Sequence, residues 1–174
     1  MALGTGYAGQ NCNLARALEV VGERWTMLVL RDCFYGVRRF GDFLAHLDIS
    51  RAVLTDRLTT LVAAGVLERR MYGGQPAYVL TEAGTALWPS LYGLLRWGAR
   101  FAPGADAPVR IFVHGACETE LDETARCPHC GLLPRPGDVV TVPAAPGGRT
   151  DPVSQALREP RRLLTPLEVS AAAG

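Results

Sequence analysis

The chain has 174 residues, a formal net charge of +1 and 18 basic residues, all of them arginine. This length suits one domain with an appendage, and no run of about 18 apolar residues is present that could cross a membrane. The first residues also lack the charged-then-apolar pattern of a secretory signal, so we expect a cytoplasmic protein with no membrane partner.

Two apolar helices are predicted near the start of the chain, over residues 14–20 and 25–35. A further helix, over residues 82–101, carries more large apolar side chains than one small domain could cover: Leu87, Trp88, Leu91, Leu94, Leu95 and Trp97. We therefore expect these helices to pair with a second copy in a homodimer. Pro89 either kinks the last helix or marks its real start, because proline suits a first helical turn.

Residues 37–81 have the pattern of a helix, a tight turn, a second helix and a hairpin. In residues 39–47, Phe40, Phe43, Leu44 and Leu47 recur at i, i+3, i+4 and i+7, which places them on one buried stripe. Ser50 is a good N-cap for the helix that follows.

The second helix has its own stripe, made of Leu54, Leu58, Leu61 and Val62, and Gly65 stands where a glycine commonly ends a helix. Strands are then predicted over residues 68–72 and 77–80, joined through the Gly73-Gly74 turn. This order of elements is typical of winged helix-turn-helix DNA readers, so the fold class is mainly α (α+β), with residues 1–102 as the winged and dimerisation domain.

The second helix is the one that would enter the major groove, with its first turn reaching base edges. Residues 1–102 hold 11 arginines against 8 acidic residues, a modest excess for a DNA binder. For single arginines a solvated or ion-paired role is the alternative, with Asp42, Asp48, Asp56 and Glu68 nearby. The candidate DNA-binding residues are Arg38, Arg39, Ser50, Arg51, Thr55, Arg57 and Arg69.

The first 100 residues closely resemble the HxlR family of winged-helix transcription regulators, which is related to the MarR group. The residues that carry the resemblance are Cys12, Ala15-Arg16-Ala17-Leu18, Gly22, Arg24-Trp25-Thr26, Leu28, Leu30, Arg39-Phe40, Ile49-Ser50, Leu54-Thr55, Leu58, Gly65, Arg69, Tyr72, Pro76, Tyr78, Leu80-Thr81, Gly84 and Trp97-Gly98. The resemblance implies a two-fold dimer on a palindromic operator in double-stranded DNA, with recognition helices about one helical turn apart.

The predicted wing is shorter than is usual in this family and has no Arg or Lys at its tip. Only the seven residues GGQPAYV lie between Tyr72 and Leu80. Minor-groove insertion is therefore in doubt, and Arg69 at the base of the wing would supply the ionic contact there.

Aromatic residues of the predicted dimerisation helices could line a pocket for a small-molecule effector. The candidates are Trp25, Phe34, Trp88 and Tyr92, with Trp97 as a further member. Aromatic side chains at helical spacing are also typical of an ordinary core, which is the alternative interpretation.

A second motif lies in residues 103–142, where His114-x-x-Cys117 is followed by Cys127-x-x-Cys130 and Gly131. Two such pairs can supply the four ligands of a tetrahedral zinc ion, so His114, Cys117, Cys127 and Cys130 are the candidate metal ligands of a small zinc-ribbon-like module. Similar cysteine-rich tails occur in a subset of HxlR-like proteins. A metal-free thiol pair or a disulfide is the alternative.

Cys12 matches the position of a cysteine that some HxlR-like regulators use to sense oxidants or electrophiles. It lies just before a predicted helix, where a thiol's pKa is lowered. A small residue buried in the dimer interface is the alternative, and Cys33 is expected in the core.

Residues 143–174 are rich in proline, alanine and glycine, and five prolines exclude a long helix: Pro143, Pro146, Pro152, Pro160 and Pro166. We expect a flexible or loosely draped tail in which Leu163, Leu164 and Leu167 could dock on a partner.

Together these features predict a dimeric, sequence-specific transcription regulator whose operator affinity responds to a small molecule or to thiol modification. The alternative is a small-molecule-binding protein on a winged scaffold with weakened DNA binding. A zinc- or thiol-dependent enzyme is not expected, because the sequence lacks a nucleophile–base pair, a phosphate loop or an acid dyad, and four protein ligands would leave zinc no open position.

Overall fold

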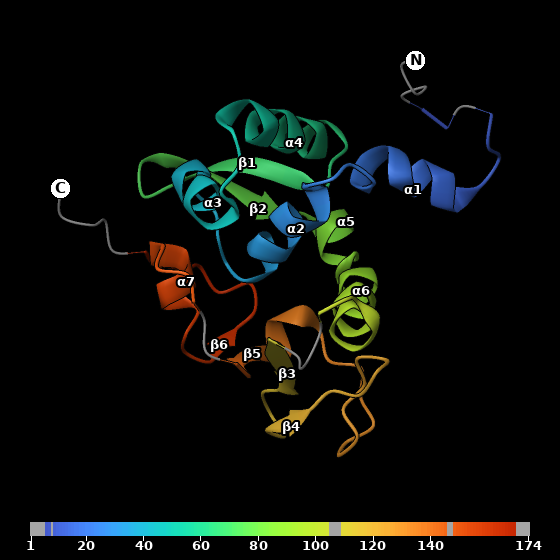
Figure 1. The fold of residues 1–174 in the computed structure, drawn as a ribbon, viewed down its shortest axis with the longest axis vertical. Helices are drawn as coiled ribbons and strands as arrows, with labels where there is room; N and C mark the ends of the chain where they lie inside the picture. The colour runs from blue at the N-terminus through green and yellow to red at the C-terminus, as the bar shows by residue number, and fades with distance from the viewer. Residues whose placement is uncertain (1–5, 8, 105–108, 146–147, 170–174) are drawn as a thin grey trace.

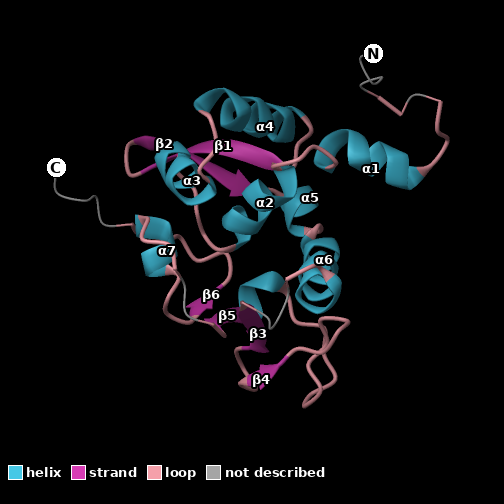
Figure 2. Ribbon diagram, in the orientation of Figure 1, coloured by secondary structure: helices cyan, strands magenta, loops and turns pink. Residues whose placement is uncertain are grey.

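The computed structural model describes residues 6–7, 9–104, 109–145 and 148–169. Helices and two small antiparallel sheets alternate along the chain, as Figures 1 and 2 show. The elements in order are α1 (Asn13–Val21), α2 (Thr26–Phe34), α3 (Phe40–Leu47), α4 (Arg51–Ala63), β1 (Leu67–Tyr72), β2 (Gln75–Leu80), α5 (Glu82–Thr85), α6 (Trp88–Phe101), β3 (Arg110–His114), β4 (Thr119–Glu120), the 3-10 turn η1 (Pro136–Asp138), β5 (Val139–Pro143), α7 (Pro152–Ala156) and β6 (Arg161–Arg162). No described helix is both long and apolar enough to cross a membrane.

The helix-turn-helix is formed by α3 and α4, as predicted. Asp48 ends α3 in the left-handed conformation, with φ of 54°, and the Ser50 hydroxyl caps α4 by accepting a hydrogen bond from the Val53 amide at 3.2 Å. Gly65, with φ of 69°, then turns the chain out of α4. Three residues of the predicted apolar stripe of α4 are buried: Leu54, Leu58 and Leu61. The prediction is wrong for Val62, because its side chain is exposed.

The wing is the β1–β2 hairpin. Tyr72 pairs with Gln75 across the two-residue turn, and both Gly73 and Gly74 have positive φ, as a tight type I′ turn requires. The strands extend the predicted ones by one residue at Leu67 and by two at Gln75. The wing is therefore a short, regular hairpin packed beside α4 (Figure 1).

The predicted helix over residues 82–101 is divided into α5 and α6. The Thr81 hydroxyl caps α5 by accepting from the Gly84 amide at 3.2 Å, and a close approach of Gly84 to the Val66 carbonyl leaves no room for a Cβ. Pro89 stands in the first turn of α6. Proline thus marks the real start of this helix, which was one of the two predicted possibilities.

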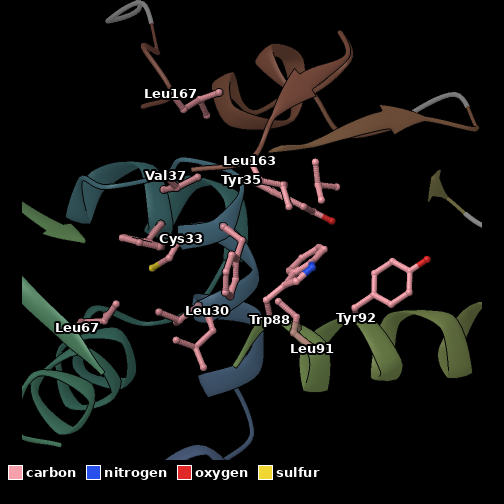
Figure 3. Packing of buried hydrophobic residues seen from close by; sticks show 14 of the residues in the cluster. Leu30, Cys33, Tyr35, Val37, Leu67, Trp88, Leu91, Tyr92, Leu163 and Leu167 are labelled. Carbon is pink, nitrogen blue, oxygen red and sulfur yellow. The ribbon is translucent and has the colours of Figure 1, made fainter. Parts of the chain in front are cut away.

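The second sheet has the strand order β4-β3-β5-β6, with all neighbours antiparallel. An aromatic cluster joins it to the winged part: Trp88 of α6 has its ring centroid 5.2 Å from that of Phe34, 5.7 Å from Tyr92 and 5.4 Å from Phe112 of β3. Figure 3 shows Trp88 and Leu91 pointing from α6 into this core.

The aromatic cluster changes the interpretation of the predicted effector pocket. Phe34, Trp88 and Tyr92 are buried core residues packed against one another, and half-buried Trp25 lies outside the cluster. Within one chain Phe34, Trp88 and Tyr92 therefore belong to the joint between the winged part and the second sheet, as in the alternative interpretation, and their part in an effector pocket stays a prediction.

Residues 148–169 form a strap along the winged part, so the expectation of a loosely draped tail is wrong for them. The Leu164 and Leu167 amides donate to the Phe34 and Gly36 carbonyls at 2.8 and 2.9 Å. Gly36 has φ of 93°, and a Cβ there would lie 1.9 Å from the Thr165 carbonyl oxygen. Apolar residues are few in this segment, and four of them are buried and anchor the strap: Val153, Leu157, Leu163 and Leu167.

Candidate nucleic-acid interface and cysteine cluster

The first turns of α4 carry the exposed polar surface expected of a recognition helix. Ser50, Arg51 and Thr55 are exposed, whereas Leu54 and Leu58 of the same turns are fully buried. The Arg51 guanidinium lies over the Phe40 ring, 5.8 Å from its centroid, which holds it near the start of α4. These groups can donate to phosphates or to base edges.

Arg39 extends this surface toward the wing. Its Nη1 donates to Gln75 Oε1 at 2.8 Å, and its guanidinium passes within 3.7 Å of the position that a Gly73 Cβ would occupy. Gln75 was not among the predicted DNA-binding residues, although its place directly after the glycine turn is a signal that could have suggested it. Arg69 is exposed on β1, where it pairs with Tyr78.

Arg38 and Arg57 make contacts within the chain instead. Arg38 lies over Tyr72, 5.5 Å from the ring centroid, and donates to the Leu164 carbonyl at 3.2 Å. Arg57 forms ion pairs with Asp56 and with Glu23, the latter at 3.4 Å, and its side chain is only 16% exposed. Arg38 and Arg57 thus have partners within the chain, whereas Ser50, Arg51, Thr55 and Arg69 are exposed and Arg39 is half-buried beside Gln75.

The four predicted metal ligands come together beside the end of β3. One imidazole nitrogen of His114 and the Sγ atoms of Cys117, Cys127 and Cys130 all lie within 4.8 Å of one another. His114 ends β3, and Cys117 follows in the turn to β4. The long loop between β4 and η1 brings the other two cysteines back beside them. Residues far apart in the sequence thus form one compact cluster.

Two tight turns shape the cluster. The Cys117 amide donates to the His114 carbonyl at 3.1 Å, and the Gly131 amide donates to the Cys127 carbonyl at 2.8 Å, with Gly131 at φ of 72°. Burial opposes ionisation of Cys127, but backbone N–H groups of Cys130 and His129 and the imidazole of His114 lower the pKa of its thiol to about 6. Such a thiolate is a soft ligand, and three sulfurs with one imidazole fit tetrahedral zinc. The exposed His129 lies outside the set.

The two cysteines of the winged part differ sharply. Cys12 is exposed at the N-cap of α1, and the backbone N–H groups of Ala15 and Leu14 lower the pKa of its thiol. Cys33 is buried in α2, where burial and the nearby Asp32 carboxylate raise its pKa far above the ordinary value. Cys12 is thus the exposed thiol of the pair, and Cys33 is a core residue as predicted.

Residues 20–106 match the family model of the HxlR-like helix-turn-helix proteins. The chain belongs to this family. The match includes α2, α3, α4, the wing and α6.

Relatives of this HxlR-like chain are named as transcriptional regulators. It is 40% identical over 135 residues to the uncharacterized HTH-type transcriptional regulator Rv3095 of Mycobacterium tuberculosis, covering 72% of this chain and 85% of the relative. It is 29% identical over 111 residues to the uncharacterized HTH-type transcriptional regulator YdeP of Bacillus subtilis, covering 60% and 87%. The chain is thus a transcriptional regulator of the winged-helix type.

A solved structure agrees with this fold. The candidate transcription factor PA1607 is 40% identical, with a TM-score of 0.50 over 54% of this chain and 69% of the other.

The similarity to Rv3095 extends further along the chain than the family model. An alignment that covers 72% of the chain must pass residue 106, because residues 1–106 are less than two thirds of it.

Proposed function

We propose that the protein is a dimeric, sequence-specific DNA-binding regulator whose operator affinity responds to a small molecule or to thiol modification. The observation that carries the DNA-binding part is the exposed first turn of α4, where Arg51 and Thr55 project from a helix fixed by the Ser50 cap and a buried leucine stripe. Arg39, Gln75 and Arg69 continue this surface onto the wing. A palindromic operator with half-sites about one helical turn (roughly 34–36 Å) apart is the expected target.

Dimerisation is supported by apolar side chains that one chain leaves in solvent. On α6, Leu94, Trp97 and Phe101 are each more than half exposed, and Leu14 of α1 is 66% exposed. Single exposed apolar residues are common, but a row of them on one helix favours burial against a second copy.

The cysteine cluster supports a structural zinc ion held by His114, Cys117, Cys127 and Cys130. Zinc would supply a fixed tetrahedral crosslink between the β3–β4 turn and the loop that ends at η1, and its four protein ligands would leave no position for a reacting group. Cys12 supports the thiol response, since it is exposed and its pKa is lowered.

The test is a gel shift with DNA from upstream of the protein's own gene, run against an unrelated duplex of equal length and composition. We expect a complex that resists competition by the unrelated duplex and has the mass of two chains per operator. Binding to both duplexes with equal affinity would contradict sequence-specific regulation.

The second candidate function is a small-molecule-binding protein that uses the same scaffold with weakened DNA binding. The observation in its favour is the short wing, whose turn consists of two glycines with no charged tip. The gel shift separates the two, because this candidate predicts no operator complex.

A further inference from the structure

Residues 118–126, which include β4, lie against α6 and form what we call the docked segment (Figure 1). The Tyr92 hydroxyl of α6 donates to the carbonyls of Leu121 and Asp122, at 3.2 and 2.8 Å. The side chains of Leu121 and Ala125 are buried in the hydrophobic core. The docked segment is thus held to α6 by hydrogen bonds as well as by apolar packing.

Arg96 attaches the docked segment to α6 a second time, about one turn after Tyr92. Its guanidinium forms ion pairs with Glu120 at 3.4 Å and with Glu123 at 3.0 Å. Fully exposed ion pairs contribute little, but the Arg96 side chain is only 23% exposed and pairs with both carboxylates. Tyr92 and Arg96 therefore fix the position of the segment relative to the helix at two points.

The helix α6 lies between the docked segment and the surface proposed for the dimer. With 3.6 residues per turn, positions 92 and 96 lie on one side of the helix, and positions 94, 97 and 101 fall on the other side. The residues of this second side are exposed and apolar: Leu94, Trp97 and Phe101. A change in how the docked segment is held can therefore reach the proposed dimer surface through a single helix.

The cysteine cluster holds the two ends of the docked segment together. Cys117 directly precedes the segment and Cys127 directly follows it, and their sulfur atoms lie within 4.8 Å of each other. The other two members extend this contact, with Cys130 Sγ 3.5 Å from His114 Nδ1. The ends of the segment are thus joined through side chains that oxidation alters, since thiols can be converted to disulfides.

Cys130 is the thiol of the cluster that an oxidant can reach from solvent. It is exposed, whereas Cys117 is half-buried and Cys127 is fully buried. Cys127 lies in the same tight turn, which is closed by the hydrogen bond from the Gly131 amide to the Cys127 carbonyl at 2.8 Å. Because exposure favours oxidation, Cys130 is the first point of attack, and Cys127 is its nearest partner along the chain.

We propose that the cysteine cluster is an oxidation site for hydroperoxides, and that a Cys127–Cys130 disulfide releases the docked segment from α6. In the first step the Cys130 sulfur attacks the peroxide: the O–O bond breaks, an S–O bond forms, and the thiol proton leaves with the alcohol. In the second step the Cys127 sulfur attacks the Cys130 sulfenic acid: an S–S bond forms, the S–O bond breaks, and water leaves. The two thiols lose two electrons, and the peroxide is reduced to alcohol and water.

The pair of cysteines that is joined decides the direction of the effect. A Cys127–Cys130 bond lies within one turn and no longer connects this turn to His114 and Cys117, so the ends of the docked segment can separate. A Cys117–Cys130 bond would instead fasten the two ends together. Because zinc is bound by thiolates, the oxidised protein is also expected to contain no zinc.

This inference deepens the proposed thiol response by naming a second oxidation site besides Cys12, and its consequence for DNA rests on that proposed function. Release of the docked segment removes the support on one side of α6. We therefore expect oxidation to weaken the dimer and the operator complex about ten-fold, which is an ordinary size for coupling between two sites.

The probe is tert-butyl hydroperoxide, applied to the full-length protein, and peptide mass spectrometry maps the disulfide. We expect a Cys127–Cys130 disulfide in the wild type and in Cys12→Ser, and none in Cys130→Ser. Oxidation confined to Cys12 would overturn the site, and a Cys117–Cys130 disulfide would overturn the direction. Circular dichroism identifies a variant that fails to fold, and the maps of the wild type and Cys12→Ser still decide the site if Cys130→Ser is one.

Amide hydrogen exchange measures the release of the docked segment without DNA. We expect residues 119–126 to exchange about ten-fold faster after oxidation, with α4 as the internal reference. Tyr92→Phe keeps the ring that packs on Trp88 and loses the two hydrogen bonds to the segment, so exchange should be faster before oxidation and change less on oxidation. Tyr7→Phe, which removes an exposed hydroxyl elsewhere, should behave like the wild type. Unchanged exchange in the oxidised wild type would overturn the release.

Dimer mass and operator affinity are measured on the same reduced and oxidised samples. Operator affinity and dimer mass that stay unchanged while the segment is released would overturn the connection through α6. A protein that forms the disulfide and releases the segment, but binds no operator in either state, would refute the proposed function and leave the oxidation site standing.

Discussion

At the scale of single residues, neighbouring arginines of α4 have opposite roles. Arg51 is exposed and held only over the Phe40 ring, so its guanidinium can reach DNA without losing another partner. Arg57, one and a half turns later, forms ion pairs with Glu23 and Asp56. The same residue type is therefore exposed at the start of the helix and tied to the segment before α2 further along it.

Replacement of Arg51 tests its part in recognition. Arg51→Ala should weaken operator binding by about 1–3 kcal/mol, because it removes a donor to phosphate or to a base edge. Arg135→Ala, which removes an exposed charge far along the chain, should leave the affinity nearly unchanged. Fluorescence anisotropy with a labelled operator measures both. Equal losses for the two variants would mean that only net charge matters.

The thiol of Cys12 should react at lower pH than an ordinary cysteine. Its pKa is lowered by the N–H groups at the start of α1, so its thiolate fraction should persist as the pH falls toward neutrality. Buried Cys33, whose pKa is raised, should stay unmodified over the same range. Iodoacetamide labelling followed by peptide mass spectrometry, with glutathione as the reference thiol, measures the rates. A Cys12 rate profile matching that of glutathione would contradict this prediction.

At the scale of elements, the two turns of the cysteine cluster each hold a pair of ligands, and His114 is the member of the four that lies in a strand of the second sheet. The sheet is small, and β4 and β6 have only two residues each. Modules of this size commonly depend on a metal or on packing against a larger part for their shape.

Removal of one ligand should therefore remove the metal. The purified protein is expected to contain one zinc per chain, and Cys127→Ser should lose it, since three ligands hold zinc far less tightly than four. His129→Ser, which changes an exposed histidine inside the same turn, should retain it. Elemental analysis after gel filtration measures the content, and zinc retained in Cys127→Ser would refute this ligand set.

The part of the strap over residues 163–169 depends on one glycine. Gly36→Ala places a Cβ against the Thr165 carbonyl and forces an L-residue into φ of 93°, so we expect a loss of unfolding free energy of about 1–3 kcal/mol or more. Gly41→Ala, inside α3 where a Cβ has open space, should be neutral or slightly stabilising. Urea unfolding followed by tryptophan fluorescence compares them. A Gly36→Ala protein as stable as the wild type would mean that the strap does not contribute to stability.

At the scale of the whole molecule, the exposed apolar face of α6 makes the proposed dimer testable. Trp97 and Phe101 lie beside each other there, with ring centroids 6.2 Å apart. Trp97→Glu should convert two-chain particles to single chains at micromolar concentration, because a charge would be buried in an apolar interface. Leu133→Glu, at a similarly exposed leucine in the cysteine-rich loop, should remain paired. Light scattering after gel filtration measures the mass.

The features that could be predicted from the sequence are those that depend on neighbouring residues. The Ser50 cap, the Gly65 helix end and the Gly73-Gly74 turn depend on residues only a few positions apart, and the structure has all three. The spacing of the four metal ligands likewise identified residues that the structure brings together.

Contacts over long separations could not be predicted in this way. The Leu164 amide meets the Phe34 carbonyl across 130 residues, and no local pattern marks either partner. Separation along the sequence likewise hides a cavity of about 990 Å³, whose lining between Met27 and Arg158 comes from six elements, α2, α3, α6, β3, β5 and α7. Proline-rich composition also suggested disorder where a few well-placed leucines are enough to anchor the strap.

The strap has a consequence for how the molecule is made. At about 5–20 residues per second, the ribosome produces Leu164, the partner of the Phe34 carbonyl, roughly 6–26 seconds after Phe34 itself. The winged part must therefore persist on the ribosome with this edge open, while the cysteine-rich loop emerges and folds. Closing of the strap over Phe34 and Gly36 therefore waits until residues 163–169 have been translated, and the end of α2 attains its finished form only then.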